Sequence, residues 1–294
     1  MKKTISILFS LWLIAQSLFA QNSGKVIESR MIKSPILGKD IRCTFYLPPN
    51  YDASDRTYPV VYLLHGYSDD DTGWLQFGEI NRLADQAIAS GEIPPMIIVM
   101  PDAGVSWYVN SYDGKVRYED FMIKELIPYV ESNFRAKKDK RYRGIAGLSM
   151  GGFGTMVLAL HNPDLFVAAA PLSAAFAVDQ DYVNTPEDRY ENVFGILYGK
   201  GLKGNDRLSE AYYKNSCLKI VENAKAEDLR KVRYWIDCGD DDFLYKGNSL
   251  MHNALRDKNI PHEFRIRDGG HTWTYWRTGI VDALKFIGIS FRQQ

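Results

Sequence analysis

The sequence predicts an α/β fold with a mostly parallel central sheet that helices cover on both faces. Two observations predict it. Short apolar runs, typical of strands buried on both faces, alternate with segments of helical periodicity. In addition, 46% of the 294 residues are hydrophobic and 24% are charged, a balance that excludes a disordered or fibrous chain. No internal repeat or Pro/Gly-rich linker divides the sequence after residue 24, so we predict one domain over residues 21–294.

Seven runs have the composition of strands. Residues 41–47 alternate between apolar and polar side chains, whereas 60–64 and 96–100 are continuously apolar. The other predicted strands are 144–147, 165–172, 232–238 and 262–266. Helical patterns lie between strands or after the last one, at 118–134, 151–161, 249–257 and 275–287. Pro128 predicts a kink in the first of these helices, because proline lacks the backbone N–H that a helix needs.

Residues 174–215 interrupt the alternation of strands and helices. The segment is rich in polar and aromatic residues, among them Tyr182, Tyr190 and Tyr198. An insertion of roughly 40 residues is long for a plain connection. We therefore predict a helical cap over a functional site, with surface decoration as the alternative.

Residues 1–20 have the pattern of a secretory signal peptide. Lys2 and Lys3 precede an apolar run, and Ala20 offers a small residue at a cleavage point. The alternative is an N-terminal membrane anchor, but polar residues interrupt a run that is already short for a ~30 Å hydrocarbon core. We expect export to the periplasm or the medium, with no stable membrane anchor after cleavage.

Charge and cysteine content exclude further classes of protein. The chain has 36 basic and 36 acidic residues, so it lacks the basic surplus that nucleic-acid binding requires. Three cysteines, Cys43, Cys217 and Cys238, leave at least one thiol unpaired, and a bridge between two of them stays open. None has a partner at zinc-ligand spacing, so we predict no metal site.

The segment Gly147-Leu148-Ser149-Met150-Gly151 fits the pattern G-x-S-x-G and lies between a predicted strand and a predicted helix. A serine at such a sharp turn exposes its oxygen above the helix N-terminus, and the glycines leave room for the turn. The context predicts a nucleophile. The alternative is a glycine-rich turn that contains an ordinary serine.

A nucleophilic serine needs a histidine base and an acid that orients it. His271 follows the last predicted strand, at the sheet edge where open α/β sheets hold their sites. Three aspartates, Asp240, Asp241 and Asp242, follow the strand 232–238 at the same edge, and the residues alone do not choose among them. For the oxyanion we expect the backbone N–H groups of Met150 and of Tyr67, which follows the strand 60–64.

With these residues in place, the chain resembles the esterase D-like branch of the α/β-hydrolases over about residues 25–290. That branch includes feruloyl and acetyl-xylan esterases, tributyrin esterases, formylglutathione hydrolases and mycolyltransferases. The motifs that carry the resemblance are Leu63-Leu64-His65-Gly66, Met100-Pro101-Asp102-Ala103-Gly104, Glu125-Leu126-Ile127-Pro128, Gly147-Leu148-Ser149-Met150-Gly151-Gly152, Cys238-Gly239 and Gly270-His271. The resemblance implies an α/β-hydrolase fold, Asp242 as the acid, and neither metal nor cofactor.

Exported members that this chain resembles are mostly plant-wall esterases. The resemblance therefore implies hydrolysis of feruloyl or acetyl esters on xylan, with an acylated polysaccharide or oligosaccharide as substrate. Four aromatic residues near the active edge are candidates for substrate contact, with packing as the alternative: Trp107, Tyr108, Trp273 and Trp276. A general short-chain acyl esterase and a catalytically silent carbohydrate-binding module are the alternative functions. The sequence carries no indication of oligomeric state.

Overall fold

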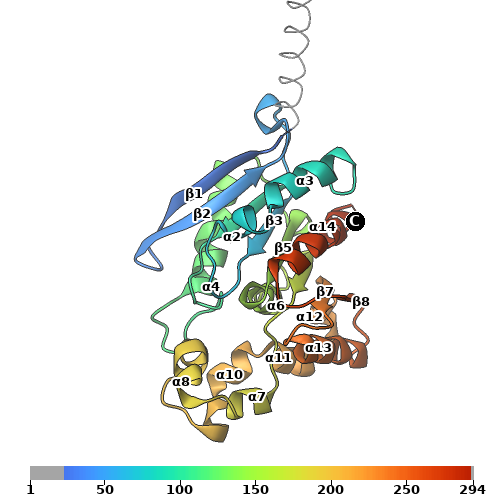
Figure 1. Ribbon diagram of the computed structural model, residues 1–294. Helices are drawn as coiled ribbons and strands as arrows, with labels where there is room; N and C mark the ends of the chain where they lie inside the picture. Colours follow the sequence, from blue (N-terminus) through green and yellow to red (C-terminus); the bar gives the residue numbers. More distant parts are fainter. Residues whose placement is uncertain (1–22, 293–294) are drawn as a thin grey trace, which may run out of the picture.

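A computed structural model describes residues 23–292, and the expected signal segment 1–20 lies outside this range. Within the described range the chain forms an eight-stranded sheet in the order β1-β2-β4-β3-β5-β6-β7-β8 (Figure 1). The strands are β1 (Lys25–Ser34), β2 (Lys39–Leu47), β3 (Val60–Leu64), β4 (Ile97–Pro101), β5 (Arg143–Leu148), β6 (Ala168–Leu172), β7 (Arg233–Gly239) and β8 (His262–Arg267). Strands β3 to β8 pair in parallel, whereas β1 and β2 add an antiparallel edge.

Two strand predictions need correction. The sequence analysis missed β1, a largely exposed edge strand whose register shifts between Ile27 and Arg30 and therefore breaks the alternation. The strand predicted at 165–172 begins only at Ala168, because Leu165 closes a turn by donating its N–H to the carbonyl of Asn162.

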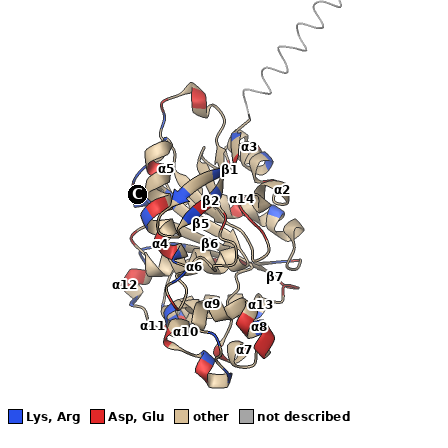
Figure 2. Ribbon diagram, turned by 90° about the vertical axis from the view of Figure 1, so that its left-hand side faces the viewer, with Lys and Arg blue, Asp and Glu red and all other residues tan. Residues whose placement is uncertain are grey.

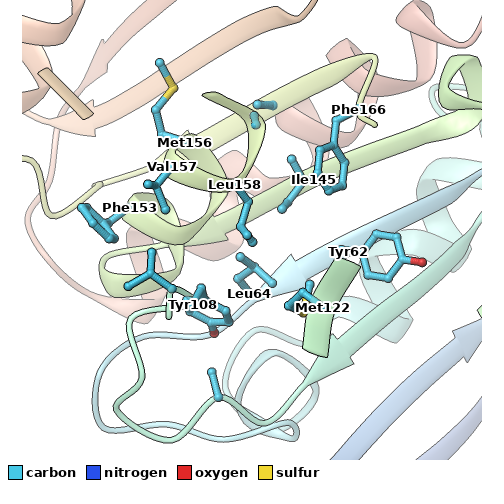
Figure 3. Close-up of a cluster of buried hydrophobic side chains, with 14 of the residues drawn as sticks. Tyr62, Leu64, Tyr108, Met122, Ile145, Phe153, Met156, Val157, Leu158 and Phe166 are labelled. Atoms are coloured by element: carbon cyan, nitrogen blue, oxygen red, sulfur yellow. The ribbon is translucent and has the colours of Figure 1, made fainter. Parts of the chain in front are cut away.

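Helices cover both faces of the sheet because the central strands carry apolar side chains on both faces. Along β3, Val61 and Leu63 pack in one core with α3 (Ile80–Ala89) and α14 (Trp273–Ser290). The alternate residues, Tyr62 and Leu64, pack on the opposite face with α6 (Met150–His161), as Figure 3 shows. The other helices outside the insertion are α2 (Gly73–Gln76), α4 (Tyr118–Phe121), α5 (Ile127–Asn133), α11 (Cys217–Asn223), α12 (Ala226–Leu229) and α13 (Tyr245–Asp257). Short 3-10 turns are η1 (Tyr51–Ala53) and η3 (Lys140–Tyr142).

The helix predicted at 118–134 contains a local change of geometry where a kink was expected. A π-helical turn, η2 (Met122–Leu126), joins α4 to α5 and ends two residues before Pro128. Pro128 stands in the first turn of α5, where a missing N–H is tolerated. The proline therefore changes the winding of the helix without ending it.

The insertion folds into short helices at one end of the molecule (Figure 1). They are α7 (Asp179–Val183), α8 (Glu187–Arg189), η4 (Tyr190–Phe194), α9 (Gly195–Tyr198), η5 (Gly204–Arg207) and α10 (Glu210–Asn215). Tyr182, Tyr198 and Tyr212 are buried and pack edge to face, with ring centroids 5.1–5.3 Å apart. Much of the aromatic content of the segment therefore forms its own small core.

The structure answers the open question about the cysteines. Cys43, Cys217 and Cys238 are all buried and free, and burial raises the pKa of each thiol. Acidic and basic residues are interspersed over the helices that face the viewer in Figure 2. Among residues 23–292, no helix combines the length and the apolar character needed to span a membrane.

We predict that an ion pair between two helices makes the stability of the fold depend on pH. Burial alone would lower the pKa of His161, but the hydrogen bond to Glu119, 3.1 Å away, raises it above its usual 6.5. Burial would raise the pKa of Glu119, but His161 and Asn162 lower it below its usual 4.5. The imidazole also bonds to the carbonyl of Lys214 in the insertion. The pair therefore stabilises fully between pH 4.5 and 6.5, and its contribution falls as the pH rises through the raised pKa of His161.

Glu119→Gln removes the carboxylate that holds the proton on His161. We expect the free energy of unfolding, measured with urea, to fall between pH 5.5 and 8.5 in both proteins. The fall should be about 1 kcal/mol larger in the wild type than in the variant. An equal loss in both proteins would contradict this assignment.

Candidate active site

The sharp turn that was predicted between a strand and a helix lies between β5 and α6. Ser149 adopts φ 55° and ψ −116°, a conformation that costs free energy in any residue other than glycine. Its N–H donates to the carbonyl of Leu172 at 3.0 Å, and its carbonyl accepts from Ala175 at 3.0 Å, so neighbouring segments hold the turn. A Cβ at Gly147 would lie 2.6 Å from the carbonyl oxygen of Gly151, so only glycine fits there.

The structure brings Ser149, His271 and Asp242 into one hydrogen-bonded chain. Nε2 of His271 lies 2.9 Å from Oγ of Ser149, and its Nδ1 lies 2.9 Å from Oδ2 of Asp242. The residues come from three separate loops at the carboxyl ends of β5, β7 and β8. This series of hydrogen bonds can move a proton from the serine to the imidazole, while the carboxylate stabilises the imidazolium.

The choice among the three aspartates follows from burial. The carboxylate of Asp242 is fully buried and accepts a further hydrogen bond from the N–H of Leu244 at 2.9 Å. Burial alone would raise its pKa, but the hydrogen bonds from His271 and Leu244 outweigh burial and lower it. Asp240 is exposed and accepts instead from the N–H of Gly269, which fastens the loop that carries His271. Asp241 is exposed as well.

The two N–H groups expected to bind the oxyanion both belong to residues that border Ser149. Within residues 23–292, neither Tyr67 nor Met150 donates its backbone N–H to a protein acceptor. The loop that carries Tyr67 lies against the nucleophile, since a Cβ at Gly66 would be 3.8 Å from Cβ of Ser149. His65 has a structural part in this loop: its Nε2 accepts from Ala103, and burial lowers its pKa so that the ring stays neutral.

A cavity of about 670 Å³ opens from the nucleophile. Ser149, Met150 and Tyr67 line it beside Trp107, and the insertion supplies one wall through residues 175–194. Residues 243–247 supply the other wall. Two contacts fasten the insertion to the loops near the serine: Tyr67 donates its hydroxyl to the carbonyl of Asn192 at 3.2 Å, and Trp107 donates to that of Val193 at 3.0 Å. The predicted cap segment therefore borders the site.

Of the four aromatic candidates for substrate contact, Trp107 lines the cavity and three do not. Trp276 is buried, donates to Oγ of Ser173 at 3.0 Å and meets the His271 ring edge to face, so it supports the histidine. Trp273 packs against Trp74 and Trp276.

The prediction for Tyr108 needs the clearest correction. Its side chain is fully buried in the core that Figure 3 shows, where Gly154 leaves room for the ring. Trp107 and Tyr108 both have positive φ, 57° and 63°, so this turn sends one ring to the cavity and the next into the core. The prediction that Tyr108 contacts substrate is wrong because solvent does not reach it. Its hydroxyl donates to the carbonyl of His65 at 3.0 Å instead, so it holds the loop of Tyr67, the expected oxyanion donor.

Tyr108→Phe tests this role because it removes the hydroxyl and keeps the ring. We expect kcat to fall about tenfold, with KM nearly unchanged, because the Tyr67 N–H is aligned most strictly for the transition state. Steady-state kinetics on a simple ester measure both constants. A fall in thermal stability without any change in kcat would show that the hydroxyl serves only the fold.

A group of acidic side chains beside the histidine loop has the spacing of metal ligands. The carboxylate oxygens of Asp240, Asp241 and Asp268 lie within 4.8 Å of one another, and all three residues are exposed. Asp240 already accepts the N–H of Gly269, so this residue shapes the loop. The buried Asp237 pairs with Arg267 at 2.8 Å and takes no part in the site.

Sequence reasoning missed Phe243 and Tyr245, which line the cavity. They stand one and three positions after Asp242 in the sequence, so this closeness to the acid was the available signal.

The parallel sheet has the α/β-hydrolase fold, and the strained serine turn with the Ser–His–Asp chain has the arrangement of residues that serine hydrolases of this fold use. The family model described as "Putative esterase" matches residues 34–287. The chain belongs to this esterase family, which confirms the resemblance found in the sequence.

Three similar proteins are informative. An acetyl esterase of Caldicellulosiruptor saccharolyticus is 27% identical over 244 residues, covering 80% of this chain and 85% of the relative. An endo-1,4-beta-xylanase/feruloyl esterase of Xylanibacter ruminicola is 38% identical over 175 residues, covering 57% of this chain and 23% of the relative. The solved structure of a ferulic acid esterase has a TM-score of 0.80 and 34% identity, covering 92% of this chain and 99% of that one. The chain spans 51% of the length of two matching esterases of Mycobacterium tuberculosis.

Proposed function

We propose that this protein is an exported serine carboxylic-ester hydrolase that removes feruloyl groups from plant-wall xylan through an acyl-enzyme. The observation that carries the proposal is the continuous hydrogen-bonded chain Ser149–His271–Asp242, whose serine lines an aromatic cavity. Export rests on the signal pattern of residues 1–20. The feruloyl group rests on the cavity and on the similarity to feruloyl esterases.

The proposed reaction has two half-reactions. Ser149 Oγ attacks the ester carbonyl while Nε2 of His271 takes its proton, and the N–H groups of Tyr67 and Met150 bind the oxyanion. The imidazolium then returns the proton to the alcohol oxygen as the carbon–oxygen bond breaks, which leaves the acyl group on the serine. A water molecule repeats the sequence, giving the carboxylic acid and free Ser149.

The walls of the cavity favour an aromatic acyl group over acetyl. The rings of Tyr67 and Phe194 lie 5.9 and 5.6 Å from that of Trp107, so three aromatic side chains gather beside the nucleophile. A phenolic ring packs well on such a surface. An acetyl group would leave most of the ~670 Å³ without contact.

A turnover panel tests the proposal with methyl ferulate, acetylated xylan and p-nitrophenyl acetate. We expect kcat/KM to be highest for methyl ferulate among esters whose leaving groups have similar acidity, so methyl acetate serves as the matched comparison. Equal rates on methyl acetate and methyl ferulate would support a general short-chain esterase instead. Absence of hydrolysis on every ester would favour a silent binding module.

A further inference from the structure

Two aromatic side chains at the mouth of the cavity are exposed to an unusual degree. Phe243 and Tyr245 expose 68% and 57% of their surface, and both line the cavity. Leaving two large aromatic side chains of one cavity lining in water costs free energy that packing would recover. Their exposure therefore indicates that a ligand covers them during function.

The chemistry of the site decides which part of the substrate reaches them. The leaving alcohol oxygen must lie within hydrogen-bond reach of Nε2 of His271, because this nitrogen protonates it. The ring of Phe243 lies 4.6 Å from the ring of His271, between centroids. The group attached to the leaving oxygen is therefore expected beside Phe243. The acyl group, bonded to the carbon that Ser149 attacks, is expected to pack against Tyr67, Trp107 and Phe194.

We propose that Phe243 and Tyr245 form a platform that binds the saccharide on the alcohol side of the ester. The proposal rests on the proposed function and adds the residues that recognise the sugar. A sugar ring presents an apolar C–H face that stacks on an aromatic side chain, while its hydroxyls stay in water. Tyr245 lies at the start of α13, one residue past Leu244, whose N–H binds Asp242, so the platform is anchored to the catalytic acid.

The experiment compares two esters with the same acyl group. Methyl ferulate has no sugar, and a feruloylated arabino-xylooligosaccharide has one. We expect Phe243→Ala and Tyr245→Ala each to lower the ratio of kcat/KM for the oligosaccharide ester to that for methyl ferulate about 5- to 20-fold. Phe243→Trp and Tyr245→Phe keep a ring and should keep most of the ratio. Tyr213→Ala, at an aromatic residue that is 49% exposed outside the cavity lining, should leave both rates unchanged.

The outcomes separate this proposal from the one on which it rests. A ratio that stays constant in both alanine variants, whether the two rates fall together or not at all, would overturn the platform while the esterase activity stands. A wild-type enzyme that hydrolyses neither feruloyl ester would overturn the proposed function, and the platform with it. A lower ratio in the alanine variants, restored by the ring-keeping variants, supports the platform.

Discussion

Ser149→Ala is expected to lower kcat for ester hydrolysis by about 10⁴- to 10⁶-fold. The hydroxyl is the atom that forms the covalent bond, and no neighbouring group replaces it at the turn. The fold should persist, because the hydrogen bonds that hold this turn involve the backbone of residue 149 and alanine keeps them. Circular dichroism and the thermal midpoint check the fold, and initial rates on methyl ferulate measure the loss.

Ser90→Ala is a suitable control, since Ser90 lies at the end of α3 and is exposed. It should retain wild-type turnover. If Ser149→Ala kept more than about a tenth of the wild-type rate, Ser149 would not be the nucleophile.

Asp242→Asn is the prediction with the second-largest effect, a loss in kcat of about 10⁴-fold. The amide has almost the same size as the carboxylate, but it cannot stabilise the charged imidazole or hold the tautomer that presents Nε2 to Ser149. The lowered pKa of Asp242 keeps the wild-type carboxylate ionised in the neutral range, so the variant also removes a charge. The rate of methyl ferulate hydrolysis at neutral pH measures the effect.

The matched control lies one position earlier in the chain. Asp241→Asn makes the same chemical change at an exposed side chain and should alter kcat less than about twofold. Were Asp241→Asn the more damaging variant, the acid would have to be reassigned within the aspartate run, and the serine and histidine would keep their roles.

Much of the fold could be predicted because its strands carry local signals. The parallel strands β3 to β7 bury both faces, so each shows a run of mostly apolar residues, and the serine turn needs a pattern of glycines that few other structures require. The edge strand β1 has one largely exposed face and a bulge. Helix α3 is amphipathic, but its buried face carries two alanines, Ala84 and Ala87, beside Ile80, so its apolar stripe is short. These elements depend on the sheet that they cover or extend.

The sequence predicted which segments meet at one edge of the sheet, but it did not predict which neighbouring residues point into the site. Position after a strand identifies a group of three aspartates, but burial distinguishes Asp242 from its neighbours, and burial is a tertiary property. Trp107 and Tyr108 are adjacent aromatic residues with opposite fates, because consecutive left-handed residues reverse the direction of the side chains. No periodic pattern signals such a turn. Phe243 escaped notice for a related reason: its contact with His271 joins two loops that are distant in sequence.

Detection of an acyl-enzyme on Ser149 tests the proposed mechanism most directly. The enzyme is mixed with excess p-nitrophenyl ferulate, quenched with acid within milliseconds, and digested for mass spectrometry of the peptide that contains Gly147 to Gly152. The mechanism predicts a feruloyl group on Ser149, a burst of p-nitrophenol close to one equivalent per enzyme, and neither signal in Ser149→Ala. A feruloyl adduct on another residue would contradict it. A burst of p-nitrophenol in Ser149→Ala would contradict it as well.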